Sequence, residues 1–254
     1  RDRIVRFVRE TVPSADAEGV VVNMCGGVDS TVTAALAVDA LGPEHVYGVI
    51  LPCNKLGEPS ARNAEALAGA LDIEHDTLHL RPLFTQFGAV IGDRFEAHED
   101  PISADALLAR LRTTVTYLAA DDRDALVCGT TNRSDRLLGR VVEYGGRDAD
   151  LSPISHLFRT DVRVLAELLD VPEFVTDRPR SVERLPEPAD GAELADGDLD
   201  RVLRLHVDEG LDAEEVAAET GIDPEVVSSL CARYARVERE RRLPRRLAPD
   251  GGSR

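Results

Sequence analysis

The feature that most constrains this chain is a glycine turn between an apolar run and an apolar-periodic segment. Residues 23–30 read Asn-Met-Cys-Gly-Gly-Val-Asp-Ser. Residues 19–22 before them are typical of a buried strand, and residues 31–36 after them open a helix. Two adjacent glycines let the backbone turn sharply and bring its amides close to a ligand, and a helix N-terminus favours phosphate. The sequence therefore predicts a phosphate-binding loop, with an ordinary strand–turn–helix corner as the alternative.

The side chains of this turn indicate a phosphate bound together with a metal ion. Asp29 by itself repels phosphate, so its presence favours a magnesium ion that bridges the carboxylate to phosphate oxygens, and Ser30 adds a hydroxyl. The Gly-Lys-Ser/Thr ending of a Walker A loop is missing. The turn instead resembles the Ser-Gly-Gly-x-Asp-Ser loop of the ATP pyrophosphatases, which cleave ATP to AMP and pyrophosphate while adenylating a substrate. Cys25 replaces the first serine, and a thiol is a weaker donor than a hydroxyl.

Strand-like and helix-like segments alternate along the chain. This order predicts an α/β fold, a doubly wound, Rossmann-like parallel sheet of about five strands with helices on both faces. Ligands of such sheets bind beyond the carboxyl ends of the strands. Two stretches rich in Pro, Gly, Asp and Glu, 91–103 and 179–198, are expected to be loops near the site. The strand-like runs lie at about 19–24, 45–51, 74–80 and 124–129, and the helical patterns at about 29–41, 60–71, 104–120 and 132–140.

Length and charge limit the possible domain organisation and the possible binding partners. The 254 residues can form one domain over 1–254, with a helical C-terminal part at about 199–247, or two small domains. Acids outnumber bases 47 to 30, the formal charge is −17, and Lys55 is the only lysine. Such a composition is typical of proteins from salt-loving organisms, although GC-rich coding also produces it. The charge argues against non-specific nucleic-acid binding, which needs cationic residues.

The cysteine spacing and the search for targeting signals indicate the expected cellular compartment. The four cysteines are far apart and form no CxxC pair, which favours a reducing cytoplasm over a disulfide framework or a zinc site. The sequence shows no signal peptide, long apolar span or lipidation motif, so we expect a soluble cytoplasmic protein without a membrane partner.

A second motif makes the resemblance specific. Residues 128–139 read Cys-Gly-Thr-Thr-Asn-Arg-Ser-Asp-Arg-Leu-Leu-Gly and follow the strand-like residues 125–127. They are similar to the Gly-Thr-x-Asn-Arg-Ser-Glu motif of the NAD synthetases, in which a Tyr-Gly pair and an Ala-Asp-x-x-Pro segment come next. This chain has Tyr144-Gly145 and, at 149–153, Ala-Asp-Leu-Ser-Pro. With further matches at 109–112, 157–162 and 241–244, the resemblance runs from about residue 3 to 247.

The resemblance implies a role for each matching residue. It assigns deamido-NAD binding to Glu143, Tyr144 and Asp150, and magnesium binding to Asp29 and Asp135. Asp135 stands where the family has a longer glutamate. Arg159 stands where it has a lysine, whose compact ammonium a planar guanidinium does not reproduce. The residues expected to bind ATP are Cys25, Gly26, Gly27, Val28, Asp29, Ser30, Arg110, Thr130, Arg159 and Ser181, and those expected to be catalytic are Asp29, Arg159 and Ser181.

The activity that this resemblance implies is the ATP-dependent amidation of deamido-NAD, nicotinic acid adenine dinucleotide, to NAD. The carboxylate attacks the α-phosphate of ATP, pyrophosphate leaves, and ammonia then displaces AMP from the acyl-adenylate. The glycine turn begins about twenty residues from the start of the sequence, which leaves no room before it for an amidase domain, so free ammonia is the expected donor. The helix that carries Ala109 to Arg112 matches the family's dimer-forming helix, which implies a homodimer.

The resemblance is weaker on the acceptor side. Val142 replaces a threonine, Glu143 replaces a lysine, and Gly146, Arg147 and Asp148 replace Asp-Gly-Gly at positions that line the dinucleotide pocket in the family. The ATP side matches better than the acceptor side. Two alternatives to NAD synthesis therefore stay open: a divergent relative that adenylates another carboxylate, and a non-catalytic ATP-binding homodimer.

The C-terminal third contains a helix–Gly–helix pattern at 214–227 that resembles a DNA reader. Residues 208–226 hold eight acids and no Lys or Arg, so we expect helix packing and no contact with nucleic acid. The Arg-rich stretch 233–246 is either a phosphate or partner contact or a solvated helix face. His98, His156 and His206 are isolated, and we expect none of them to be a ligand or base.

Overall fold

The computed structural model of the chain describes residues 1–53, 58–91, 101–139, 149–176 and 194–241. These residues form two compact units, the first from 1–133 and 148–182 and the second from 134–147 and 183–254. The expectation of one domain over 1–254 stays a prediction.

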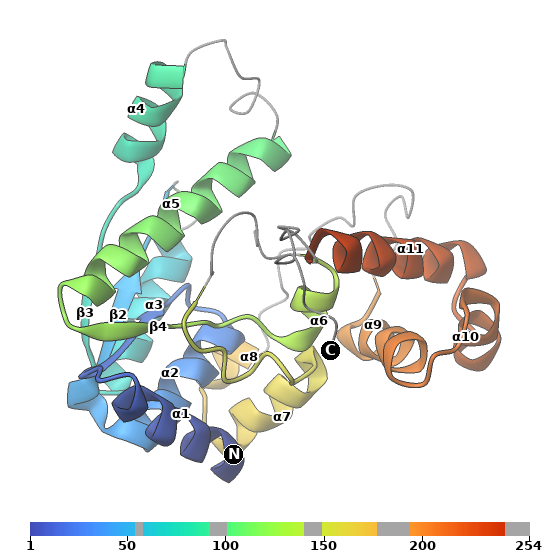
Figure 1. The fold of residues 1–254 in the computed structure, drawn as a ribbon, viewed down its shortest axis with the longest axis horizontal. Coiled ribbons are helices and arrows are strands. Elements are labelled where there is room, and N and C mark those ends of the chain that lie inside the picture. The colour runs from blue at the N-terminus through green and yellow to red at the C-terminus, as the bar shows by residue number, and fades with distance from the viewer. Residues whose placement is uncertain (54–57, 92–100, 140–148, 177–193, 242–254) are drawn as a thin grey trace, which may run out of the picture. The chain divides into compact units, whose positions relative to one another are not determined.

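The first unit is built on a parallel sheet with the strand order β3-β2-β1-β4 (Figure 1). All four strand-like runs of the sequence are confirmed. About five strands were expected, and the described residues contain four paired strands; beyond β4, a single parallel bridge joins Cys128 to Leu151. The strands are β1 (Gly19–Asn23), β2 (Val46–Ile50), β3 (Glu74–Thr77) and β4 (Ala125–Cys128).

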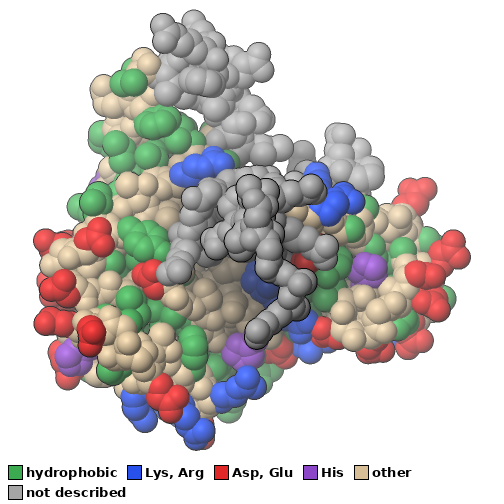
Figure 2. All heavy atoms as spheres, in the orientation of Figure 1, with side chains coloured by type: hydrophobic (Ala, Val, Ile, Leu, Met, Phe, Trp, Pro, Cys, Tyr) green, Lys and Arg blue, Asp and Glu red, His purple; other side chains and the backbone are tan. Residues whose placement is uncertain are grey.

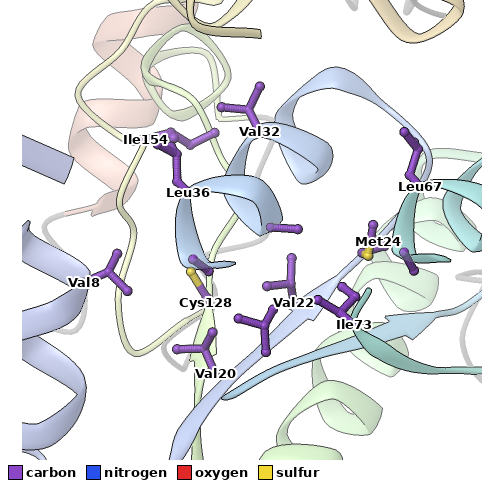
Figure 3. Close-up of a cluster of buried hydrophobic side chains, with 14 of the residues drawn as sticks. Val8, Val20, Val22, Met24, Val32, Leu36, Leu67, Ile73, Cys128 and Ile154 are labelled. Carbon is purple, nitrogen blue, oxygen red and sulfur yellow. The ribbon is translucent and has the colours of Figure 1, made fainter. Parts of the chain in front are cut away.

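Helices cover both faces of this sheet, as the alternation predicts. On one face, Val20 and Val22 of β1 pack in a cluster with residues of the helices α1 (Asp2–Ser14), α2 (Val28–Leu41), α3 (Glu58–Ala70) and α7 (Arg159–Leu168). Figure 3 shows the centre of this cluster, where Val8, Leu36 and Leu67 come from three different helices. The neighbouring Val21 faces the opposite side and packs with residues of α5 (Pro101–Asp121). A continuous valine run is thus buried on both faces of a parallel sheet.

Among its described residues, the first unit also contains the helix α4 (Arg81–Ile91) and two short helices. The helix α4 follows β3, whose side chains alternate between exposed and half-buried. The short helices are η1 (Pro43–His45) and α8 (Glu173–Thr176).

The second unit is helical and contains α9 (Asp196–Leu203), η5 (Arg204–Asp208), α10 (Ala213–Thr220) and α11 (Pro224–Arg241), while α6 (Arg133–Leu137) begins at the boundary between the units. The Asp212 carboxylate accepts hydrogen bonds of 2.9 Å from the amides of Glu214 and Glu215 and so caps α10. Gly221, at φ +72°, ends that helix. The expected helix–Gly–helix pattern at 214–227 is therefore confirmed.

Two segments expected to be loops include residues that are helical in the structure. Most of 91–103 and 179–198 lies outside the described residues, but 101–103 belong to α5 and 196–198 to α9. The loop prediction was wrong at these ends because Pro101 suits the first position of a helix, and Asp196 and Asp198 suit the positive end of its dipole. Within the described ranges, no helix has both the length and the apolar character needed to cross a bilayer.

Candidate active site

The glycine turn leaves β1 and enters α2 at Val28, at the carboxyl edge of the sheet. Gly26 has φ +73°, a left-handed conformation, and a Cβ built on it would lie 2.3 Å from the carbonyl oxygen of Ser60. Only glycine fits there, because the turn packs directly on the backbone of α3. At Gly27 the nearest atom to a built Cβ is Sγ of Cys25, at 3.4 Å. The two glycines therefore differ: the first is required by space and backbone, and the second leaves room.

Hydrogen bonds inside the turn converge on the carbonyl of Gly27. It accepts from the amide of Thr31 at 3.1 Å, from Oγ1 of Thr31 at 2.8 Å and from Oγ of Ser30 at 3.1 Å. The amide of Cys25 in turn donates to Oγ of Ser30 at 3.3 Å. Ser30 is fully buried and braces the turn from inside, whereas Cys25 is exposed. The turn is thus held in shape by its own polar groups, with the N-terminus of α2 behind it.

The second motif lies next to the glycine turn, because β4 pairs with β1 in the register Val22 to Cys128. Thr130 follows β4 and is half-buried. Two residues later, the side-chain amide of Asn132 donates a hydrogen bond of 2.9 Å to Oδ1 of Asp29. The structure therefore joins the two motifs through a partly buried contact that the sequence alone did not predict.

Arg159 is the first residue of α7 and is only 5% exposed. A buried cation is costly unless anionic groups surround it, and the N-terminus of a helix does not favour positive charge. The segment before it is anchored to the second motif, since the amide of Arg133 donates to the carbonyl of Leu157 at 2.7 Å and its guanidinium lies 4.6 Å from the centre of the Phe158 ring. Arg159 is thus held at the start of α7, directly after a segment bonded to the second motif.

Two other expected binding residues lie in the first unit. The carboxylate of Asp150 accepts from the amide of Val127 at 2.9 Å and from the hydroxyl of Tyr117 at 3.4 Å, so it fastens the edge of β4. Arg110 is exposed on α5. Arg112, on the same helix, donates from Nε to the carbonyl of Leu51 at 3.3 Å, just beyond β2.

In the second unit, Asp135 lies in the first turn of α6 and is half-buried. The preceding Ser134 is fully buried and donates a hydrogen bond of 2.5 Å to Oδ1 of Asp200 on α9, which is 2% exposed. Asp200 is a second residue that the sequence reasoning missed. The remaining expected positions lie outside the described residues: Ser181, Val142, Glu143, Tyr144 and 146–148.

The carboxylates of Asp29 and Asp135 suit Mg²⁺ better than a metal ion that is bound by protein ligands alone. In the described part of the chain, no group of three or more His, Cys, Asp or Glu side chains is arranged to hold a metal ion. Mg²⁺ is usually bound by one or two carboxylates together with substrate phosphates. Asp29, held by Asn132 beside a phosphate-type turn, fits that pattern.

The Arg-rich stretch begins on α11 in the second unit. A cavity of about 920 Å³ between α10 and α11 is lined by Arg233, Arg236 and Arg239, and by Glu214 and Glu225. Nε of Arg233 also donates to the carbonyl of Leu138 at 2.6 Å. The described part of this stretch is thus neither a purely solvated face nor a purely basic one.

Comparison with known proteins reveals relatives along nearly the whole chain. The NH(3)-dependent NAD(+) synthetase of Halobacterium salinarum is 36% identical over 246 residues, covering 96% of this chain and 91% of that protein. The enzyme of the same name from Methanosarcina mazei is 33% identical over 247 residues, covering 96% and 95%.

Solved structures agree on the fold. The NH3-dependent NAD synthetase of Campylobacter jejuni superposes with a TM-score of 0.79 at 22% identity, covering 97% of this chain and 96% of the other. An NMN synthetase from Francisella tularensis superposes with a TM-score of 0.73 at 25% identity, covering 98% and 96%. The family model described as NAD synthase matches residues 1–244, and this chain belongs to that family.

Proposed function

We propose that this chain is an ammonia-dependent NAD synthetase, which uses ATP to convert the carboxylate of deamido-NAD into the amide of NAD. The observation that carries the proposal is the partly buried contact between Asp29 and Asn132, which joins a glycine turn suited to pyrophosphate to the second nucleotide motif. The two relatives at 36% and 33% identity support the choice of acceptor and of ammonia as donor.

In the proposed reaction, the turn from Cys25 to Ser30 binds the phosphates of ATP through backbone amides and the N-terminus of α2. Asp29 and Asp135 would hold Mg²⁺, which when bound neutralises charge on the phosphate oxygens. Arg159 and Ser181 would contact the phosphates, and Thr130 and Arg110 the nucleotide. Catalysis then comes from positioning and charge neutralisation, because the protein forms no covalent bond with either substrate.

The chemistry proceeds in two displacements. A carboxylate oxygen of deamido-NAD forms a bond to the α-phosphorus of ATP while the bond to the β-phosphate oxygen breaks, and pyrophosphate leaves. The nitrogen of ammonia then attacks the acyl carbon, AMP departs with the electron pair of the acyl–oxygen bond, and the amide nitrogen loses a proton. Glu143, Tyr144 and Asp150 are the proposed contacts to the acceptor.

A second candidate acceptor is favoured by one observation, the likeness to an NMN synthetase over 98% of this chain. NMN is also an amide, and the acid that it requires is nicotinic acid mononucleotide. The two candidate reactions differ in the acceptor, and Val142 and Glu143, at positions expected to contact it, stand where the resemblance implies a threonine and a lysine.

We also propose a homodimer that forms through the apolar side of α4 and α5. Leu83, Phe87 and Val90 on α4, and Leu118 on α5, are between 40% and 84% exposed. Figure 2 shows hydrophobic side chains gathered over α4. Contiguous exposed apolar side chains mark interaction sites. The working compartment in this proposal is the cytoplasm, where four free cysteines stay reduced.

Exchange of labelled pyrophosphate into ATP tests these proposals. The purified chain is given ATP and Mg²⁺ with deamido-NAD, with nicotinic acid mononucleotide, or with neither. We expect exchange with deamido-NAD and amide formation once ammonium is added. Exchange with the mononucleotide alone would identify the second candidate, and ATP binding without any exchange would indicate a non-catalytic protein.

A further inference from the structure

Asn132 stands out because it is a polar side chain that is fully buried, at 0% exposure. Its Nδ2 donates to Oδ1 of Asp29 over 2.9 Å, across 103 positions of sequence. An ionised carboxylate can only accept hydrogen bonds, so the amide of Asn132 must present its nitrogen to Asp29. The contact therefore fixes the direction in which the carboxylate points.

The chemistry of this contact suits a carboxylate that binds a metal ion while a second residue holds the carboxylate in place. A carboxylate offers about four lone-pair sites, and the Asn132 amide uses one of them on Oδ1. Residues that hydrogen-bond a ligating carboxylate orient it and tune its affinity for the ion. A neutral amide does this without adding a positive charge that would compete with the cation. Because Asn132 is fully buried, it acts on the carboxylate and not on a ligand in solvent.

We propose that Asn132 is a positioning residue that sets the affinity of the ATP site for Mg²⁺ by orienting the carboxylate of Asp29. The proposal rests on the proposed function in one respect, the assignment of Asp29 as a magnesium ligand. Under this proposal, the loss of the Asn132 amide weakens Mg²⁺ binding, whereas the direct contacts between the protein and the nucleotide stay intact.

The test is the Mg²⁺ dependence of ATP binding to Asn132→Ala and Asn132→Ser, measured by calorimetry without any acceptor. Both variants remove the amide, and the serine hydroxyl is too short to replace it. The Mg²⁺ concentration for half-maximal ATP binding should rise about 10-fold or more, as is typical for such partners. Binding of ATP in the presence of EDTA should stay within about twofold, because one carboxylate–amide contact is all that changes.

Thr116→Val is the matched control. Thr116 is buried on α5, and its hydroxyl donates to the carbonyl of Arg112 at 2.9 Å, so the variant also loses one partly buried hydrogen bond. It should leave the Mg²⁺ requirement unchanged. If Asn132→Ala weakens ATP binding equally with and without Mg²⁺, Asn132 acts on the fold alone and the inference is overturned.

A double-mutant cycle with Asp29→Asn gives a second, independent readout. Asn132→Ala should add little to the Mg²⁺ requirement in the Asp29→Asn background, because the carboxylate that it orients is gone. Equal effects in both backgrounds would contradict the proposal. An unchanged Mg²⁺ requirement in Asp29→Asn alone would also overturn it, by removing Asp29 as a ligand. Failure of the proposed function is distinguishable, since it appears as a native chain that binds Mg–ATP and forms no NAD.

Discussion

The glycine turn and the helix α4 belong to the same unit, and the chain buries them to different extents. Around the turn, most residues of β1 and of the first three turns of α2 are buried, and polar groups of the turn are bonded to one another. On α4, Leu83, Phe87 and Val90 are 44%, 40% and 84% exposed. The turn therefore needs nothing beyond this chain to keep its shape, whereas α4 presents apolar surface that a second molecule can cover.

This difference separates the two halves of the proposed function. The proposed ATP binding uses a turn whose shape one chain maintains by itself. The proposed homodimer uses surface that one chain leaves exposed. Variants at the turn should therefore affect nucleotide chemistry without changing assembly, and variants on α4 should do the reverse.

The largest effect is expected for Asp29→Asn. The variant keeps the shape of the side chain and its place in the first turn of α2, but it removes the negative charge. Turnover should fall on the order of 100-fold or more, because a metal ion supplies several kcal/mol of charge stabilisation. Steady-state formation of AMP measures this loss, and an unchanged solution mass is the control for assembly. Turnover within threefold of the native chain would remove Asp29 from the mechanism.

The next largest effect is expected for Gly26→Ala. The added methyl meets the Ser60 carbonyl at 2.3 Å and sits at φ +73°, so we expect a loss of about 2–4 kcal/mol in the free energy of unfolding and weaker ATP binding. Thermal unfolding and calorimetry measure the two effects.

Gly27→Ala is the matched control, because its nearest contact is 3.4 Å away and its φ is −99°. This variant should unfold within about 1 kcal/mol of the native chain. Equal losses at both glycines would contradict the packing of the turn on α3.

Phe87→Glu on α4 should weaken the dimer by about 30-fold, since covering a large apolar side chain contributes about 2 kcal/mol. Because Phe87 is 40% exposed, the monomer should stay folded, as circular dichroism checks. Light scattering at working salt gives the dimer affinity. Leu168→Glu on α7, where the side chain is 66% exposed outside α4 and α5, is the control. A native chain that is already a monomer would disprove the homodimer.

The smallest effect is expected for Cys25→Ser, which restores a hydroxyl at the exposed position in the turn. Sγ of Cys25 lies 3.4 Å from Oγ of Ser30, so a serine oxygen can join the same hydrogen-bond group. The KM for ATP should fall about threefold, within the range of one added hydrogen bond. Cys53→Ser, outside the turn, should leave that KM unchanged. An unchanged KM in Cys25→Ser would show that the amides and Mg²⁺ carry the binding.

Much of the fold was predictable from local patterns. The valines of β1 and the glycines after it define the strand, the turn and the start of α2 without any knowledge of the rest. The match of 128–139 to the second motif was predictable in the same way. The start of α5 at Pro101 was missed because a helix N-terminus and a loop favour the same residue types.

The contacts within the site were less predictable, because they depend on tertiary pairing. Asn132 and Asp29 meet only because β4 lies beside β1, and nothing in either motif states which side chain the amide will reach. The same holds for Ser134 and Asp200. Ser30 was expected to offer its hydroxyl to phosphate, and in the structure that hydroxyl is buried and bonded to Gly27. Its contact with ATP stays a prediction.

The most direct measurement of the central claim is the product balance when the chain is given deamido-NAD, ammonium, ATP and Mg²⁺. NAD, AMP and pyrophosphate should form in equal amounts, and omission of ammonium should stop NAD formation while pyrophosphate exchange continues. Formation of ADP and phosphate, or the absence of NAD despite exchange with another acid, would contradict the account.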